Sequence, residues 1–203
     1  MTLSGTWYEP STRTGPAVIL VHMLHRTHSD WDALATRLAA EGIGALAFDL
    51  RGHGESTGAI PADGQFAAFQ QDLAAARRYV STRSDVLPRR LGIAGASLGA
   101  ALAVLDAAQS TAVTSIALLS VSTEYRGLRS DAAMKKYAGR ALLAYSDDDP
   151  YAARSARELI KLQAPGAAAR ETLTLPHAGH GTNMLTADPS LLPALVDWFQ
   201  RTL

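Results

Sequence analysis

The segment from Leu91 to Leu105 constrains the fold of this chain more than any other. It begins as a short apolar run at 91–94, passes through Gly95-Ala96-Ser97-Leu98-Gly99, and continues as an Ala- and Leu-rich stretch of helical composition. Only small residues let a strand and a helix pack closely across so sharp a turn, which lifts the central hydroxyl out of the sheet. The following helix N-terminus directs unpaired N–H groups at negative charge beside it. We therefore predict a strand–turn–helix unit that presents Ser97.

Strand and helix patterns alternate along the rest of the chain. The continuous apolar runs at 17–22 and 45–49 are typical of strands buried on both faces of a parallel sheet. Apolar residues spaced by three and four between Phe66 and Val80 predict a long helix. This alternation predicts an α/β fold with a mostly parallel sheet covered by helices on both faces. Other expected strands are 6–8, at an edge, 91–94, 115–120, 140–145 and 172–175, and other expected helices are 131–137 and 153–163.

Two helix starts carry capping signals. Ser29 has Asp32 three residues later, as in a capping box, and Trp31, Leu34 and Leu38 then fall on one helix face. The last helix is expected to open with Asp188 as N-cap and with Pro189 at the first helical position, and its core-facing residues would be Leu192, Leu195, Val196 and Phe199.

Length and composition bound the class of protein. A chain of 203 residues is long enough for one domain with a sizeable core and short for two, so residues 1–203 are expected to form a single domain. A hydrophobic content of 47% with 19% charged residues is typical of a soluble globular protein. The formal net charge is zero and no basic patch occurs, which argues against nucleic-acid or membrane partners. The oligomeric state is not indicated.

The chain has no cysteine, which excludes disulfides, thiolate metal sites and a cysteine nucleophile. Its first ten residues lack the basic region and apolar run of a secretory signal. The apolar runs are strand-sized, whereas a bilayer span needs roughly 20 residues. A cytoplasmic location is the default expectation.

Polar residues follow two of the predicted strands. Asp147, Asp148 and Asp149 come after the strand at 140–145, and His177 and His180 come after the strand at 172–175. Ligands collect at the carboxyl ends of the strands in such a sheet, so these side chains are expected at the same edge as Ser97. A serine nucleophile needs a base and an orienting acid, and the chain order Ser, Asp, His is that of hydrolases with a strand–turn–helix serine.

Four motifs make a resemblance specific. They are Val21-His22 with the loop after it, the run from Asp49 to Ser56, the turn from Gly95 to Gly99, and Gly179-His180-Gly181. Along nearly its full length the chain resembles the α/β-hydrolase superfamily, and it is most similar to the small, capless, dienelactone-hydrolase-like and esterase-like members. The resemblance implies neither a cofactor nor a metal.

The resemblance also implies site roles. Ser97 would be the nucleophile and His180 the general base, with Asp149 as the acid and Asp148 as the alternative. The oxyanion would be bound by the backbone N–H of Leu98 and of a residue after His22, either Leu24, which we favour, or Met23. Relatives commonly have His-Gly where this chain has His22-Met23, and glycine adopts backbone angles that methionine resists.

Other histidines offer competing interpretations. His177 could replace His180 as the base, but it lies outside the Gly-His-Gly context. His22, His25 and His28 recur every three residues, a spacing that suggests metal ligands, yet neither a cysteine nor a nearby carboxylate pair completes a ligand shell. Asp49 and Arg51 are expected to fix their loop through hydrogen bonds.

These features favour a serine esterase that acts on small-molecule carboxylic esters through an acyl-enzyme. Only about 20 residues separate the strands at 115–120 and 140–145, where many relatives insert a cap, so the pocket is expected to be shallow and the acyl chain short. A thioesterase or acyltransferase would use the same triad, and a binding protein of this fold without catalysis is the alternative from another class. A peptidase is less expected.

Overall fold

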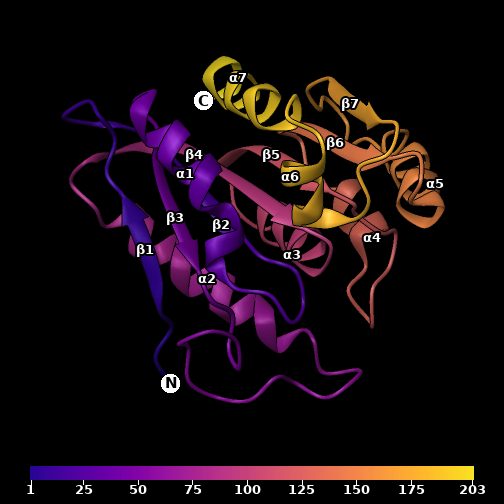
Figure 1. Cartoon of the computed structure of the whole chain (residues 1–203), viewed down its shortest axis with the longest axis horizontal. Coiled ribbons are helices and arrows are strands. Elements are labelled where there is room, and N and C mark those ends of the chain that lie inside the picture. The colour runs from indigo at the N-terminus through magenta and orange to yellow at the C-terminus, as the bar shows by residue number, and fades with distance from the viewer.

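A seven-stranded sheet runs through the protein in the order β1-β3-β2-β4-β5-β6-β7 (Figure 1). The computed structural model describes residues 1–203. Neighbouring strands pair in parallel, except that β1 runs antiparallel to β3 at one edge. The strands are Gly5–Tyr8 (β1), Gly15–Val21 (β2), Gly44–Phe48 (β3), Val86–Ala96 (β4), Val113–Leu119 (β5), Arg140–Ser146 (β6) and Arg170–Leu175 (β7).

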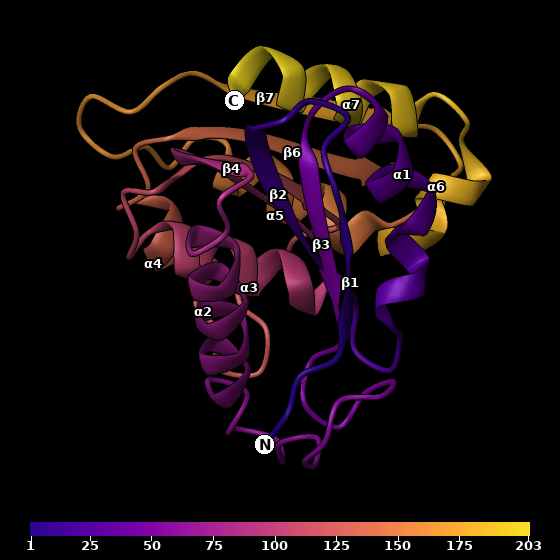
Figure 2. The same ribbon diagram turned by 90° about the vertical axis from the view of Figure 1, so that its left-hand side faces the viewer.

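Helices cover both faces of this sheet, as Figure 2 shows with α1 and α7 on one side and α2 and α3 on the other. None of them combines the length and the apolar character that crossing a membrane requires. The α-helices are Asp32–Ala40 (α1), Ala68–Ser81 (α2), Leu98–Ala107 (α3), Ser130–Met134 (α4), Pro150–Leu159 (α5), Met184–Ala187 (α6) and Leu191–Thr202 (α7), and the 3₁₀ turns are His28–Trp31 and Gly181–Asn183.

The central strands contribute to two cores at once. In β2, Ile19 and Val21 pack in the core that includes α2 and α3, whereas Val18 and Leu20 pack in the core that includes α1 and α7. Successive side chains of a strand point to opposite faces, so both sets of positions must be apolar. This explains the continuous apolar runs and confirms the predicted α/β class.

No cap domain covers the carboxyl edge of the sheet. Residues 120–139, between β5 and β6, contain only α4 and a tight turn at Arg126 and Gly127. Both turn residues have positive φ, of 47° and 91°, as a type I′ turn requires. The expected absence of an insertion at this point is confirmed.

Three helix starts differ from the predictions. Ser29 does not cap a helix, because its hydroxyl bonds Thr27 and α1 begins only at Asp32, after a 3₁₀ turn. α7 begins at Leu191, because Asp188 accepts from Ser190 instead of capping a helix. α5 begins at Pro150 and not at 153, and its Asp-Pro start was an available N-cap signal. The strand bounds move by five residues or fewer, mainly through an early start of β4.

Candidate active site

Ser97 stands on a sharp turn between β4 and α3, with φ 52° and ψ −111°. The two glycines that flank it are required by close backbone contacts. A Cβ on Gly95 would lie 2.1 Å from the carbonyl oxygen of Gly99, and one on Gly99 would lie 2.2 Å from that of Val21. Ser97 is also the one position between 91 and 100 that is not buried. The turn therefore presents the hydroxyl at the carboxyl end of a central strand, as predicted from the sequence.

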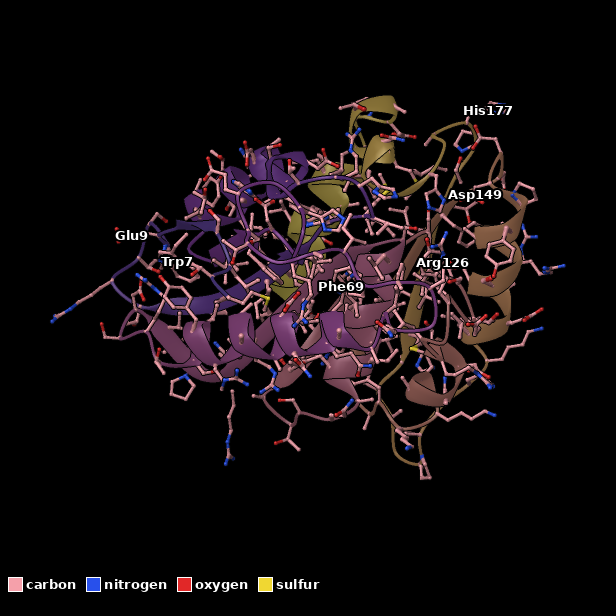
Figure 3. The ribbon with its side chains drawn as sticks, turned by 90° about the horizontal axis from the view of Figure 1, so that it is seen from below. Trp7, Glu9, Phe69, Arg126, Asp149 and His177 are labelled. Carbon is pink, nitrogen blue, oxygen red and sulfur yellow. The ribbon has the colours of Figure 1, made fainter.

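His180 and Asp149 form a close polar contact at this edge. The Nδ1 atom of His180 lies 2.5 Å from Oδ2 of Asp149. Asp149 is the N-cap of α5, and its Oδ1 accepts from the N–H of Ala152 at 3.1 Å. Figure 3 shows Asp149 at the start of that helix. A carboxylate on Nδ1 fixes the tautomer of an imidazole and leaves Nε2 free to exchange a proton on the other side.

The neighbouring acidic residues have other partners. Asp148 accepts from the hydroxyl of Ser146 and from the N–H of Gly179. These two hydrogen bonds, that from Ser146 above all, hold the pKa of Asp148 below its usual value. Asp147 is exposed and pairs with Arg157 at 3.4 Å. Of the two candidate acids, the structure brings Asp149 to His180. His177 is exposed and lies at the margin of the molecule (Figure 3).

The segment that carries His180 returns across the sheet towards Ser97. β7 lies three strands from β4, a distance of about 14 Å at the usual strand spacing. On the way, the N–H of Ala178 bonds Ser146 at the end of β6, and the N–H of Gly181 bonds the hydroxyl of Ser120, just past β5. Ser97 makes no hydrogen bond to His180 in this structure. Such contacts are often long without a ligand and tighten with substrate.

Ser120 was missed in the sequence analysis, although its place at the carboxyl end of the predicted strand 115–120 was an available signal. It is buried and has a φ of 52°, a conformation that non-glycine residues rarely adopt. Its hydroxyl also faces the sulfur of Met184 at 3.9 Å. Strained residues of this kind cluster at functional sites.

The loop after β2 brings candidate oxyanion donors to the same edge. The backbone N–H groups of Met23 and Leu24 have no hydrogen-bond partner within the protein. The N–H of Leu98 is at the first position of α3, where no intrahelical partner exists. Met23 is compatible with this loop because the left-handed position falls at His25, with φ 61°.

The buried imidazoles of His22 and His53 hold the loop after β2 through hydrogen bonds to its backbone and to the neighbouring loop. His22 accepts from the N–H of Leu50 at Nε2 and contacts the carbonyl of Met23 at 2.6 Å through Nδ1. Burial lowers the pKa of His22 to about 4, so the ring is neutral at pH 7. His53 accepts at Nε2 from the N–H of His25. The ring nitrogens of His22 are thus committed to the backbone and not to a metal.

Asp49 and Arg51 fix the adjoining loops, as the sequence suggested. The carboxylate of Asp49 accepts from the N–H groups of His28 and Glu55. Burial acts to raise the pKa of Asp49, but these hydrogen bonds and the close approach of the His28 ring, 3.0 Å from Oδ1, outweigh it and hold the pKa below its usual value. Arg51 forms a buried ion pair with Asp72.

Comparisons with known structures show how widely this fold recurs. Dienelactone hydrolase from Anabaena variabilis superposes with a TM-score of 0.81 at 16% identity, over 99% of this chain and 92% of that one. Est1E from Butyrivibrio proteoclasticus, with ferulic acid bound, superposes with a TM-score of 0.82 at 16% identity, over 98% of this chain and 95% of that one. An esterase of Pyrococcus furiosus superposes with a TM-score of 0.80 at 17% identity, over 98% of this chain and 86% of that one.

The sequence comparisons cover less of the chain. An uncharacterized protein of Mycobacterium tuberculosis is 40% identical over 102 residues, which are 49% of this chain and 35% of that protein. The family model described as serine aminopeptidase, S33 matches residues 12–146, a range that includes the Ser97 turn and ends before Asp149. With two thirds of its length matched and the fold in agreement, the chain belongs to this serine hydrolase family of the α/β-hydrolase superfamily.

Proposed function

We propose that the protein hydrolyses carboxylic esters of small molecules through an acyl-enzyme formed on Ser97. The observation that carries this proposal is the Asp149–His180 pair, held at the same sheet edge as the Ser97 turn. A serine hydroxyl needs an imidazole base, and the base needs an orienting carboxylate, for nucleophilic catalysis at neutral pH.

In the first half of the reaction, His180 takes the proton of Ser97 at Nε2 as the serine oxygen attacks the ester carbonyl. Asp149 accepts from Nδ1–H and stabilises the imidazolium. The N–H groups of Leu98 and Leu24 bind the oxyanion, with Met23 as the alternative second donor. The intermediate collapses as the bond from the carbonyl carbon to the ester oxygen breaks and His180 donates its proton to that oxygen, which leaves as the alcohol. The acyl group then remains on Ser97.

In the second half, His180 removes a proton from water, which attacks the acyl carbonyl. A second tetrahedral intermediate forms at the same N–H groups. Its collapse releases the acid and returns the proton from His180 to Ser97. The exposed position of the His180 side chain, 46% accessible, gives water a direct route to the imidazole.

The absence of a cap argues for short acyl groups. Residues 120–139 add no domain above the sheet edge, so few apolar side chains surround a long acyl chain there. The fold is shared with an esterase and with Est1E, whose structure holds ferulic acid. A small-molecule ester is therefore the substrate class that the site supports best.

The test is a panel of p-nitrophenyl esters from acetate to dodecanoate together with an acyl thioester. An aminoacyl p-nitroanilide is added to test for aminopeptidase activity, because the matching family model is described as serine aminopeptidase. We expect turnover of acetate and butyrate, with kcat/KM falling for longer chains. Ser97→Ala should lower kcat by roughly 10⁶-fold. Esterase activity that survives Ser97→Ala would refute the assignment of Ser97 as the nucleophile. Faster turnover of the thioester or the anilide would replace the ester as substrate class, and no turnover of any substrate would favour a binding protein.

A further inference from the structure

We propose that Asp30 is a positioning residue, which ties the loop carrying His180 to the loop carrying the second oxyanion donor. The proposal rests on the proposed function, because it assigns a role to a contact between two parts of that same site. The two loops come from different elements, one after β7 and one after β2, and β4 with Ser97 lies between them in the sheet.

Three consecutive residues of the His180 loop are held by three separate side chains. His180 is held by Asp149 after β6, and the N–H of Gly181 is held by Ser120 after β5. Thr182 then donates its hydroxyl to Oδ2 of Asp30, at 2.5 Å. The loop thus crosses the sheet from β7 to the far side of Ser97, and Asp30 is its last anchor.

Asp30 belongs to the oxyanion loop on its other side. Arg26 donates to both oxygens of this carboxylate, from Nε at 2.8 Å and from Nη2 at 2.9 Å. Charge-assisted forks of this kind fix the geometry as well as the charge of a carboxylate. The side chain of Asp30 is 12% exposed and Thr182 is 4% exposed, so the hydroxyl–carboxylate bond is largely shielded from water.

A packing contact joins the same two loops beside this hydrogen bond. The side chain of Met23 fills the space above Gly181, where a Cβ would lie only 2.0 Å from its sulfur. Met23 is buried and immediately precedes Leu24. A polar bond at Thr182 and an apolar contact at Gly181 therefore connect the base loop to the oxyanion loop within two residues.

This connection matters because the base and the oxyanion donors act on one tetrahedral centre. The imidazole must reach the serine oxygen while the N–H groups reach the carbonyl oxygen of the same substrate. Misplacement of a catalytic group by about 1 Å can lower the rate by roughly 100-fold. Loss of the Asp30 anchor should lower kcat while leaving substrate binding in place.

The test compares Thr182→Val, which keeps the shape and removes the hydroxyl, with Thr182→Ser, which keeps the hydroxyl. We expect Thr182→Val to lower kcat for p-nitrophenyl acetate by about 10- to 100-fold with KM unchanged. Thr182→Ser should stay within about threefold of wild type. Asp30→Ala provides a second variant, and Asp32→Ala is its matched control, because Asp32 lies nearby on α1 and contacts Tyr8 at the surface.

A double-mutant cycle then isolates the bond. The double variant Asp30→Ala, Thr182→Val should be no slower than the slower single variant, since both remove the same link. Independent losses that multiply would overturn the proposal, as would wild-type kcat in both single variants. The Tm of each variant is measured as well. If kcat falls in proportion to Tm across all the variants, Thr182→Ser included, these residues have a purely structural role and the proposal is overturned. If Ser97→Ala retained activity, the proposed function itself would fail instead.

Discussion

Asp148 and Asp149 are adjacent carboxylates with different partners, because they leave β6 at different points of the turn into α5. Asp149 caps α5 and faces His180, whereas Asp148 accepts from Ser146 and Gly179 within the loop. The sequence favoured Asp149 as the triad acid and kept Asp148 as the alternative, because both carboxylates follow the same strand within three residues. Only the path of the chain after β7, which no local pattern encodes, separates them.

The first prediction concerns these two residues. Asp149→Asn should lower kcat by about 10⁴-fold, because an amide stabilises the wrong imidazole tautomer. Asp148→Asn should lower kcat by less than about tenfold, because it loosens the loop without touching His180. Steady-state kinetics on p-nitrophenyl acetate measures both. A larger loss in Asp148→Asn than in Asp149→Asn would reverse the assignment.

The helices and strands of this fold could be predicted from the sequence more reliably than the residues at which they begin and end. Strands such as 17–22 and 45–49 were readable because both faces of the sheet are buried, which leaves an uninterrupted apolar run. Helix starts at Ser29 and Asp188 were misassigned because those side chains bond within their own loops. The bond between Thr182 and Asp30 spans 152 residues, so no sequence window could show it.

The turn between β4 and α3 gives the second prediction. Gly99→Ala should abolish esterase activity and lower the free energy of unfolding by about 1–3 kcal/mol, because the new Cβ would clash with the Val21 carbonyl oxygen in a packed core. Gly166→Ala is the control for a change from glycine to alanine without a steric clash, because the space around Gly166 is empty. Its left-handed φ of 72° already makes alanine unfavourable there, so a smaller loss than in Gly99→Ala isolates the contact with the Val21 carbonyl. Activity assays and urea unfolding measure the two effects. A fully active Gly99→Ala would show that the strand and helix do not need this contact.

At the scale of the whole molecule, residues far apart in the chain meet because parallel strands end at one edge. Ser97 follows β4, Asp149 follows β6 and His180 follows β7, while the oxyanion loop follows β2. The same geometry buries the supporting groups behind the edge, His22 among them. The stability of the fold is thereby coupled to the protonation of a side chain behind the site.

That coupling gives the third prediction. The pKa of His22 is about 4 in the folded protein against 6.5 for the free side chain, so the unfolded chain binds more protons between these values. The free energy of unfolding should therefore fall as the pH drops from about 6.5 to about 4, with His22 contributing on the order of 3 kcal/mol. Urea unfolding at several pH values should show a shallower acid loss in His22→Gln than in wild type. Equal slopes would contradict the burial argument.

Covalent labelling tests the central claim most directly. A fluorophosphonate probe reacts with a serine only where a base and oxyanion donors activate it. Digestion and mass spectrometry of the labelled protein should place the adduct on Ser97, with no adduct in Ser97→Ala and strongly slowed labelling in His180→Ala. An adduct on any other serine, or no adduct on the folded wild-type protein, would contradict the account.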